Sequence, residues 1–461
     1  MNEIGTLASG RVRLAGRRRP PPPAPRRWWR SASWAAGAAS VLVVIVLWGR
    51  DGGYRDEPLT ALGRVTGLLG SDLLLLQVLL MARIPWVERS FGQDALARAH
   101  RLVGFGSCWL MLAHVALITA GYARTGGDGI LGTGWDLVVT YPGMLLATAG
   151  TLLLVLVVVL SVRAARRRLR YESWHLLHLY AYLGVGLALP HQLWTGADFT
   201  ASAAATVYWW GLYSAALLAV AVFRLGLPLW RSAYHRLRVD QVVAEAPGVV
   251  SVYLRGHRLD RLPVRAGQFF LWRFLDGPGW SRAHPYTLSA GPAPDTLRIT
   301  VKDLGDGSRR VRSLRPGTRV LIEGPYGVLT AGRSNGRPPL LIAAGVGITT
   351  MRALLDDLAA PDTVLLYRVR GRAEAVFRAE LDDLGRRRGV RVVYLDGPRS
   401  RHRSWLPAGL DAPGTVRRIV PDIAVREAYL CGPPAWMAAV RADLRAAGLP
   451  AGRIHSEEFA W

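Results

Sequence analysis

Four histidines in the apolar first half of the chain stand at two nearly equal spacings. His114 follows His100 by 14 positions, and His191 follows His178 by 13 positions. On an α-helix these separations are close to four turns, so the members of each pair share one face and lie about 20 Å apart. If both helices run in the same direction, His100 lies level with His178, and His114 with His191. Two facing imidazoles are the ligand set of a six-coordinate b-type haem, so the spacing predicts two haems.

Other interpretations exist for these residues and their polar neighbours. Four buried histidines could each bond to a neighbouring group, although ionisable side chains inside membrane spans are costly and mostly functional. His175 is a rival ligand, but it stands 16 positions before His191 and therefore below the expected level of the inner haem. Asp72 could line an acceptor site or a proton path near the outer haem, or it could accept an interhelical hydrogen bond.

Apolar runs long enough to cross a bilayer position these histidines. A span needs about 20 predominantly apolar residues, and the stretch from Trp34 to Trp230 holds six candidates. They are Ser33–Trp48, Val65–Ile84, Leu102–Tyr122, Leu137–Val162, Trp174–Trp194 and Ala204–Leu225. The first run is short, but further spans follow it at once, which argues against a cleaved signal peptide. The sequence therefore predicts a bundle of six transmembrane helices in contact with lipid.

Arginines between the runs indicate the orientation of this bundle. Clusters precede the first run, separate the second from the third and the fourth from the fifth, and follow the sixth. The alternate loops hold few basic residues. By the positive-inside rule, the basic loops and both termini are cytoplasmic, as in a multi-pass protein of the plasma membrane. Binding of anionic lipid is the alternative explanation for these clusters.

The composition excludes several classes of protein. Of the 461 residues, 51% are hydrophobic, which excludes a disordered chain. The 58 Lys and Arg exceed the 33 Asp and Glu and give a formal net charge of +25. This charge is unevenly spread and almost entirely arginine, so we expect no nucleic-acid partner. The two cysteines, Cys108 and Cys431, form neither a disulfide scaffold nor a four-cysteine metal cluster.

The second half of the chain has a different pattern. From Leu237 onward, short β-type runs are broken by Gly and Pro, which is typical of a small antiparallel β-barrel. From Pro339 onward, apolar strands alternate with helical stretches, which indicates a parallel α/β layer. We therefore expect a basic, Pro-rich cytoplasmic arm at 1–32, a transmembrane haem domain at 33–232, a β-barrel at 237–333 and an α/β domain at 338–461.

The chain from about residue 60 to its end resembles the ferric reductase and NADPH oxidase superfamily in its bacterial form. Its histidine pairs have the separations of that family's haem ligands, and His284-Pro285-Tyr286-Thr287-Leu288-Ser289 resembles the family's flavin-binding motif. The resemblance implies that the transmembrane domain is ferric reductase-like, that the β-barrel binds FAD and that the α/β domain binds NAD(P)H.

The chemistry of the flavin motif supports this resemblance. An aromatic ring and hydroxyl groups at the end of a barrel strand can flank a flavin and bond its edges. Gly305-Asp306-Gly307-Ser308 then opens a predicted helix whose amides suit the FAD pyrophosphate, and an ordinary turn with a serine cap is the alternative. The expected FAD-binding residues are His284, Pro285, Tyr286, Thr287, Ser289, Gly305, Gly307 and Ser308.

Two further segments resemble the nicotinamide motifs of the family. Leu341 to Thr350 reads as a strand, a glycine turn that lets the backbone approach a pyrophosphate, and a helix start. Thr350 stands where the family usually has proline, which suits the first helical turn but is not required there. Leu430-Cys431-Gly432-Pro433-Pro434 matches the second motif. The expected NAD(P)-binding residues are Gly345, Gly347, Ile348, Thr349, Arg368, Arg370, Cys431, Gly432 and Pro433.

The resemblance also implies roles near the reacting atoms. It places Cys431 beside the position of hydride transfer, and a buried strand-end cysteine is the alternative. Arg368 and Arg370 follow the next strand, where guanidinium groups favour the 2′-phosphate of NADPH, although the general arginine bias leaves NADH open. Related reductases stack a near-terminal aromatic residue on the flavin; Phe459 matches that position, and Trp461 competes with it.

The implied function is transmembrane electron transfer. NAD(P)H delivers electrons to FAD at the cytoplasmic face, and two b haems pass them to an outer acceptor, either oxygen or a ferric or cupric complex. Donation to a dedicated partner protein is a further possibility. From a different class, the chain could be a haem-binding membrane sensor or anchor with a nucleotide-binding flavin domain. The oligomeric state stays open.

Overall fold

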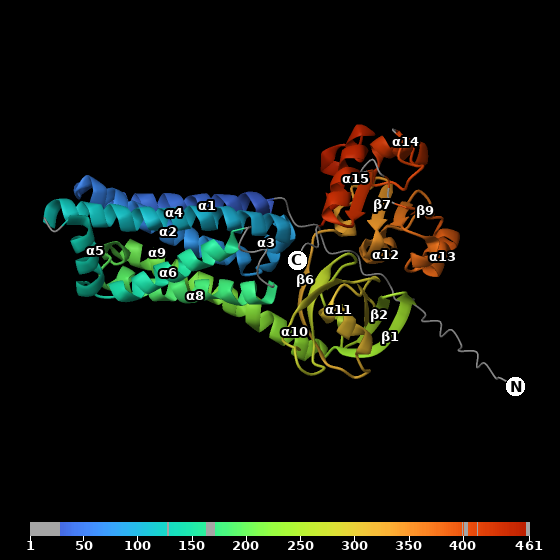
Figure 1. Ribbon diagram of the computed structural model, residues 1–461, viewed down its shortest axis with the longest axis horizontal. Coiled ribbons are helices and arrows are strands. Elements are labelled where there is room, and N and C mark those ends of the chain that lie inside the picture. Colours follow the sequence, from blue (N-terminus) through green and yellow to red (C-terminus); the bar gives the residue numbers. More distant parts are fainter. Residues whose placement is uncertain are drawn as a thin grey trace. The chain divides into compact units, whose positions relative to one another are not determined.

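The computed structural model describes residues 28–126, 129–162, 171–398, 400, 404–412 and 414–457. These residues form two compact units, residues 28–230 and residues 231–457. The first unit is helical, and the second contains all the strands described (Figure 1).

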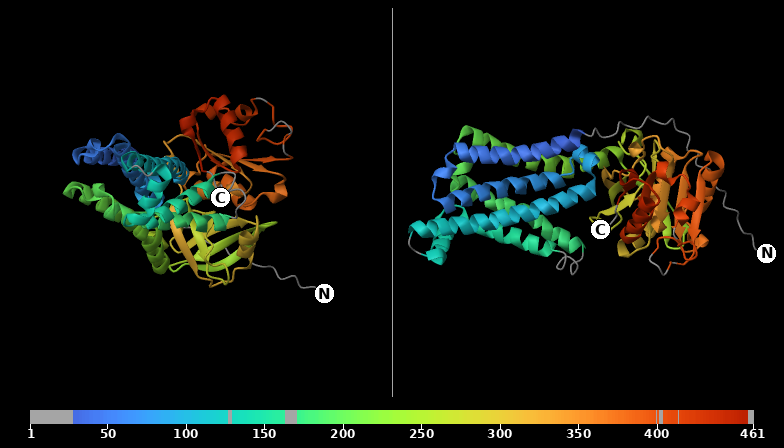
Figure 2. Two further views of the ribbon diagram at one scale, coloured as in Figure 1. Left: turned by 60° about the vertical axis from the view of Figure 1, so that its left-hand side comes forward. Right: turned by 90° about the horizontal axis from the view of Figure 1, so that it is seen from above.

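Long helices run side by side in the first unit (Figures 1 and 2). They are α1 (Trp28–Arg50), α2 (Pro58–Met81), α4 (Gln93–Gly126), α6 (Met144–Ser161), α8 (Tyr171–Trp194) and α9 (Ala203–Ala219). Shorter helices accompany them: α3 (Pro85–Phe91), α5 (Gly129–Thr140) and α10 (Leu227–His235). A π-helical turn at Val220–Gly226 joins α9 to α10. The helix α10 carries the chain into the second unit.

Five helical segments of the described chain are long and apolar enough to cross a membrane. They are α1, α2, α4, α6 and the continuous segment Ala203–His235. The predicted span Trp174–Trp194 forms the helix α8, but α8 is not among these five. It contains the polar residues His175, His178, His191 and Gln192. A sixth membrane-spanning helix is therefore not confirmed.

The predicted span Leu137–Val162 is wrong at its start. The structure divides this region into α5 and α6, with a break at Tyr141–Gly143. Pro142 has no N–H to donate, and Gly143 has a φ of 81°, which is a left-handed conformation that glycine adopts readily. The last apolar run also differs from the prediction, because the helix continues beyond Leu225 as far as His235.

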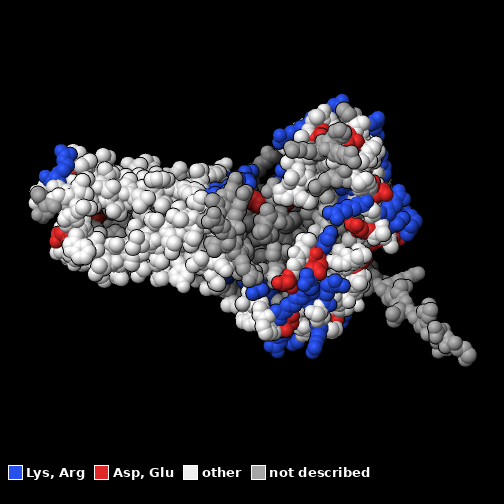
Figure 3. Space-filling model, viewed as in Figure 1, with Lys and Arg blue, Asp and Glu red and all other residues white. Residues whose placement is uncertain are grey.

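Apolar side chains cover the outside of the helical unit. Large exposed residues such as Leu102, Leu131 and Val207 lie on the long helices. Figure 3 shows that the flank of this unit is almost free of charged residues, whereas the second unit carries many. A wide uncharged surface of this kind matches contact with lipid hydrocarbon.

Six strands of the second unit form two antiparallel sheets. One has the order β1-β2-β5 and the other β4-β3-β6. Their strands are β1 (Arg238–Ala246), β2 (Val249–Arg255), β3 (Phe269–Phe274), β4 (His284–Thr287), β5 (Thr296–Lys302) and β6 (Val320–Tyr326). Single bridges at Arg238–Arg319 and Leu288–Ile299 link the sheets around one apolar core. The described strands do not form one continuous ladder, so closure of the predicted barrel is not confirmed.

A five-stranded parallel sheet follows, with the order β11-β10-β7-β8-β9. Its elements are β7 (Pro339–Ala344), α12 (Ile348–Leu358), β8 (Val364–Val369), α13 (Arg378–Arg388), β9 (Arg391–Asp396), α14 (Thr415–Ile419), β10 (Glu427–Cys431), α15 (Pro434–Ala446) and β11 (Ile454–Ser456). Apolar clusters that include residues of α12 and of α15 pack on this sheet. The predicted alternation of strands and helices is confirmed.

The order of these strands creates a switch point at the carboxyl end of the sheet. The chain leaves β7 toward β8 on one side, whereas β10 lies on the other side of β7. Loops that follow two strands on opposite sides of such a switch point diverge, and open α/β sheets bind ligands in the resulting crevice. The Gly345–Gly347 turn after β7 and Cys431 at the end of β10 both lie at this edge.

Candidate functional site

One predicted histidine pair is brought together in the helical unit. The rings of His100 on α4 and His178 on α8 have centroids 5.9 Å apart, with 65° between their planes. Two imidazoles bound to one metal ion by bonds of about 2 Å place their centroids about 6 Å apart. The Trp174 ring lies 5.1 Å from the ring of His178. The pair therefore fits an iron atom between its two rings.

The second predicted pair is less closely joined. Nδ1 of His114 lies 2.8 Å from the carbonyl oxygen of Gly63 on α2. Nδ1 of His191 on α8 lies 2.5 Å from the carbonyl oxygen of Ala188. No ring contact between His114 and His191 is found among the described residues, although the two side chains are near enough to interact electrostatically.

In all four histidines Nδ1 lies within hydrogen-bond distance of an oxygen atom, a backbone carbonyl in three of them and a serine hydroxyl in His178. Nδ1 of His100 lies 3.2 Å from the carbonyl oxygen of Gln77, and Nδ1 of His178 lies 3.3 Å from Oγ of Ser161. Metal-ligating histidines almost always use one ring nitrogen in this way, which fixes the ring and leaves the other nitrogen for the metal. The donor set therefore fits b-type haem. Across the described chain, no group of three His, Cys, Asp or Glu side chains could hold a metal ion, but haem needs only two axial ligands.

Glycines on neighbouring segments leave room for His114 and His191. A Cβ atom at Gly67 on α2 would lie 2.4 Å from Nδ1 of His114, and one at Gly143 would lie 2.8 Å from the backbone nitrogen of His191. His175, the rival ligand, has its ring 6.5 Å from that of Trp174 and shows no ring contact with His100 among the described pairs. Small residues that let helices and rings approach are typical of membrane bundles.

Asp72 joins three helices. It is fully buried on α2, and its Oδ1 accepts hydrogen bonds of 2.7 Å from Oγ of Ser40 on α1 and from the hydroxyl of Tyr208 on α9. Its Oδ2 has no partner in the described part of the chain. These contacts favour the interhelical hydrogen bond over a role at an acceptor site.

The flavin motif forms strand β4 and part of a cavity. The rings of His284 and Tyr286 stack with centroids 6.0 Å apart, and a Cβ at Gly307 would lie 2.5 Å from Cε1 of His284. The two flavin segments therefore meet. A cavity of about 160 Å³ lies there, lined by Phe274, Asp276, Gly279, Arg282, His284, Asp306, Gly307, Arg310, Val311 and Leu314. Of its two arginines, Arg310 already pairs with Asp276 of the same lining at 2.7 Å, so Arg282 is the candidate for contact with a pyrophosphate.

The hydroxyl groups of the motif differ in their surroundings. Tyr286 is largely buried, which raises the pKa of its phenol above the ordinary value. Ser289 is fully buried and bonded inside the protein. Ser308 closes a turn: its Oγ accepts from the backbone N–H of Leu304 and donates to the carbonyl of Gly305. Ser308 lies inside the helix α11 (Asp306–Arg310), which has only 5 residues and has Gly305 at its N-cap with no side-chain cap. The segment is therefore a short helical turn, and the serine N-cap of the alternative is not found.

The nicotinamide segments meet at the edge of the parallel sheet. A Cβ at Gly347 would lie 2.3 Å from the carbonyl oxygen of Cys431, so the turn packs directly on the end of β10. Thr350, which replaces the proline of the family, has its Oγ1 3.5 Å from Sγ of Cys431. Ile348 and Thr349 start α12 and are buried, and Pro433 precedes α15.

Cys431 and Glu457 lie close to each other. Burial raises the pKa of the Cys431 thiol to about 12, and the Glu457 carboxylate acts in the same direction. A Cβ at Gly327 would lie 2.9 Å from Oε2 of Glu457. Sequence reasoning missed Glu457, because no motif marks a carboxylate that folds back from the chain end. The predicted stacking residues Phe459 and Trp461 lie outside the described residues.

The arginines after β8 are not equivalent. Arg368 donates to the carbonyl oxygens of Leu395 and Pro398, each at 3.1 Å, and so ties neighbouring strand ends together. Arg372 pairs with Asp396 at 3.4 Å. Arg370 is exposed and has no ion pair among the described residues. It is the arginine best placed to meet a phosphate.

Comparisons with known proteins agree with this division of the chain. Residues 66–189 match the family described as ferric reductase like transmembrane component. The ferredoxin reductase component of 3-ketosteroid-9-alpha-monooxygenase from Mycolicibacterium smegmatis is 32% identical over 237 residues, which are 48% of this chain and 65% of that protein. A flavohemoprotein from Chromobacterium violaceum is 29% identical over 249 residues, 50% of this chain and 61% of that protein. The matches span less than two thirds of either relative.

A solved structure is similar over the same share of the chain. The flavohem-like FAD/NAD binding domain of nitric oxide dioxygenase from Vibrio cholerae O1 biovar El Tor is 25% identical, with a TM-score of 0.39, and covers 49% of this chain and 98% of its own. The chain thus joins a segment similar to the ferric reductase like transmembrane component to a second half similar to the ferredoxin reductase component and the flavohemoprotein named above. This is the combination that its histidines and flavin motif resemble in the ferric reductase and NADPH oxidase superfamily.

Proposed function

We propose that the protein moves electrons across the plasma membrane, from cytoplasmic NAD(P)H to a ferric or cupric complex or oxygen at the outer face. Bound FAD would accept the hydride, and two b haems would carry the electrons one at a time. Residues 237–333 would hold the FAD, residues 338–461 the nucleotide and residues 33–232 the haems. The arginine-rich loops support cytoplasmic termini.

The observation that carries this proposal is the inner histidine pair. His100 and His178 face each other at 5.9 Å, on helices of a bundle whose outer surface is apolar. Each of the four histidines has Nδ1 in contact with an oxygen. This contact orients the ring and presents Nε2 as a ligand. His114 and His191 would hold the second haem in the same way.

Residues of the second unit would bind the flavin and the nucleotide. The stacked His284 and Tyr286 form one wall of the flavin site, and the Gly345–Gly347 turn lets the nucleotide backbone approach the sheet edge. The Cys431 thiol stays neutral at physiological pH because burial raises its pKa to about 12. It therefore places a small uncharged group beside the reacting atoms.

Haem content and haem reduction of the purified full chain test this proposal. We expect about two b haems per chain and rapid reduction of both by NADPH; a sensor or anchor does not need to show such reduction. His114→Ala and His191→Ala should each remove one haem and leave flavin reduction intact. His175→Ala, the matched control, should keep both haems. Two normal haems in either of the first two variants would contradict the ligand assignment.

A further inference from the structure

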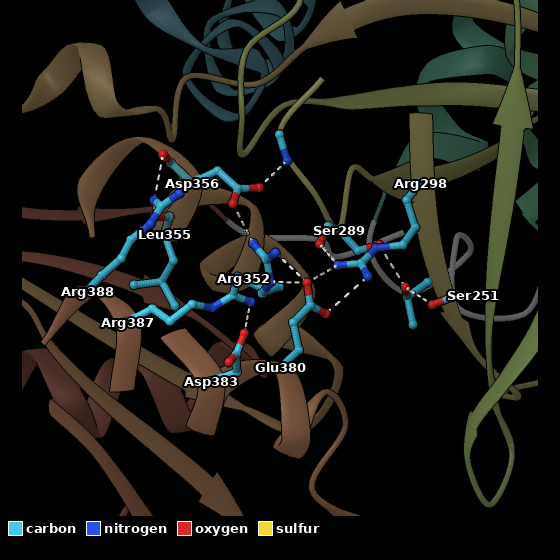
Figure 4. A network of polar contacts seen from close by, with 12 residues as sticks. Ser251, Ser289, Arg298, Arg352, Leu355, Asp356, Glu380, Asp383, Arg387 and Arg388 are labelled. Atoms are coloured by element: carbon cyan, nitrogen blue, oxygen red, sulfur yellow. Dashed lines mark hydrogen bonds and ion pairs between the residues drawn. The ribbon is translucent and has the colours of Figure 1, made fainter. Parts of the chain in front are cut away.

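A network of ion pairs between two buried arginines and two partly exposed carboxylates joins the flavin-binding sheets to the nucleotide domain (Figure 4). Arg298 on β5 reaches Glu380 on α13, with Nη1 3.1 Å from Oε2 and Nη2 3.4 Å from Oε1. Arg352 on α12 donates through Nε to the same Oε1 at 2.6 Å. Arg352 also pairs with Asp356 at 2.9 Å. Asp356 in turn accepts a hydrogen bond of 2.7 Å from the backbone N–H of Gly291.

The network begins at the end of the flavin motif. Arg298 donates through Nε to Oγ of Ser289 at 3.2 Å and through Nη2 to the Ser289 carbonyl oxygen at 2.6 Å. Thr300 donates to the same Oγ at 2.7 Å. The chain then runs from Ser289 to Gly291, which is bound by Asp356. The contacts therefore form a closed ring through both domains.

The network ends on the helix that starts at the nicotinamide motif. The helix α12 begins at Ile348, directly after the Gly345–Gly347 turn. Arg352 and Asp356 lie about one and two turns further along the same helix. A helix of this length moves as a rigid rod, so a side chain that fixes α12 also fixes the turn at its start.

The charges in this network are balanced and largely shielded. Arg298 and Arg352 are 8% and 3% exposed, and they meet the carboxylates of Glu380 and Asp356. The Arg298 guanidinium also lies over the Phe377 ring, 4.6 Å from its centroid. Burial alone would lower the pKa of Arg298, but Glu380 and Tyr253 together outweigh this effect and raise it. A guanidinium fork meets carboxylate and carbonyl oxygens in a fixed geometry, so these bonds set an orientation as well as a distance.

We propose that Arg298, Glu380, Arg352 and Asp356 are positioning residues that hold the nucleotide domain at the distance and angle from the flavin site that hydride transfer requires. This inference rests on the proposed function. In that step the C4–H bond of the reduced nicotinamide breaks, and the hydride moves with both electrons to the flavin ring. The nicotinamide is thereby oxidised and the flavin reduced. None of the four residues needs to touch either ring.

Two conservative variants test the proposal in the full chain. Arg298→Lys keeps the charge that Glu380 needs but lacks the planar guanidinium fork that holds Ser289 and Glu380 in one geometry. Glu380→Gln keeps the shape but removes the charge. Asp422→Asn is the matched control. It breaks another arginine–carboxylate pair, Arg426–Asp422 at 2.8 Å, which lies entirely within the nucleotide domain.

Rapid mixing with NADPH and with C4-deuterated NADPH reports the hydride step. A displacement of about 1 Å at a reacting centre can cost about a hundredfold in rate, so we expect flavin reduction to slow by about ten- to a hundredfold in both variants. FAD content and the KM for NADPH should stay near the unmodified values, and the deuterium effect should persist. Hydrogen exchange without nucleotide should speed up at residues 289–291, because the ring that holds this segment is open. Asp422→Asn should change none of these quantities.

Three results would overturn the proposal. One is an unchanged rate of flavin reduction in both variants. Another is equal slowing in Asp422→Asn, which would assign the effect to general loss of stability. The third is unchanged hydrogen exchange at 289–291. If the unmodified chain does not reduce its flavin with NADPH, the proposed function fails by itself, and hydrogen exchange still decides whether the network couples the two domains.

Discussion

Gly67 leaves the space that the His114 ring occupies, so Gly67→Ala should weaken the outer haem site selectively. The new Cβ would lie 2.4 Å from Nδ1 of His114, whereas ordinary contact begins at 3.4 Å, so the ring must retreat by about 1.0 Å (3.4 − 2.4). That movement stretches the 2.8 Å contact between Nδ1 and the Gly63 carbonyl oxygen. The hydrogen bond lost is worth about 1 kcal/mol.

The effect on haem binding follows from the role of that hydrogen bond. Loss of a group that orients a ligating histidine lowers metal affinity by about 10- to 100-fold, which corresponds to about 1.4–2.8 kcal/mol. At limiting haem, the ratio of haem to protein should therefore fall from about two toward about one. The inner haem, held by His100 and His178, should keep its absorbance and midpoint potential.

Haem and FAD per chain, together with a redox titration of the haem bands, measure this outcome. Gly186→Ala is the matched control, because a Cβ at Gly186 on α8 meets nothing within 4 Å. Equal haem content and equal midpoint potentials in the Gly67→Ala and Gly186→Ala proteins would refute the assignment of His114 as a ligand.

Three further predictions concern the soluble unit. In a Cys108→Ser background, iodoacetamide should label Cys431 slowly until the pH approaches 12, and near pH 9 once the chain is unfolded. The raised pKa means that this thiol stabilises the fold below about pH 9 and that the contribution is lost as the pH rises toward 12; equal labelling of folded and unfolded protein at pH 9 would contradict it. Arg370→Ala should raise the KM for NADPH about tenfold and leave that for NADH unchanged, and equal effects on both would exclude 2′-phosphate binding. Deletion of Phe459–Trp461 should alter nicotinamide affinity, and unchanged kinetics would show that these aromatic rings do not cover the flavin.

Local patterns predicted the elements that carry the site. The alternation after Pro339 predicted the parallel sheet because buried parallel strands are apolar runs separated by amphipathic helices. The strands containing Phe269–Phe274 and Thr296–Lys302 were predicted from short β-type runs between Gly and Pro. Helical spacing and direction place His100 level with His178, and their rings are 5.9 Å apart. The same argument pairs His114 with His191, whose rings show no such contact in the described chain.

Features that depend on tertiary contacts were not predictable in this way. A hydropathy pattern treats Tyr141–Gly143 as part of an apolar run, although a proline and a left-handed glycine end the helix there. The pairing of Arg298 with Glu380 joins residues 82 positions apart, and no local pattern encodes such a contact. The same applies to Arg368, which binds strand-end carbonyls rather than standing free.

The contact between Ser40 and Asp72 gives α1 a part in the integrity of the bundle. The helix α1 precedes residues 66–189, the segment that matches the transmembrane family. A truncated protein that began at α2 would keep that whole segment. It would also remove Ser40, one of the two hydroxyl groups that donate to the buried carboxylate of Asp72. Hydrocarbon contains no water that could replace the lost hydrogen bond. The shortened protein should therefore insert poorly, or bind another helix in place of α1. The helix α1 is therefore required for a stable helical bundle.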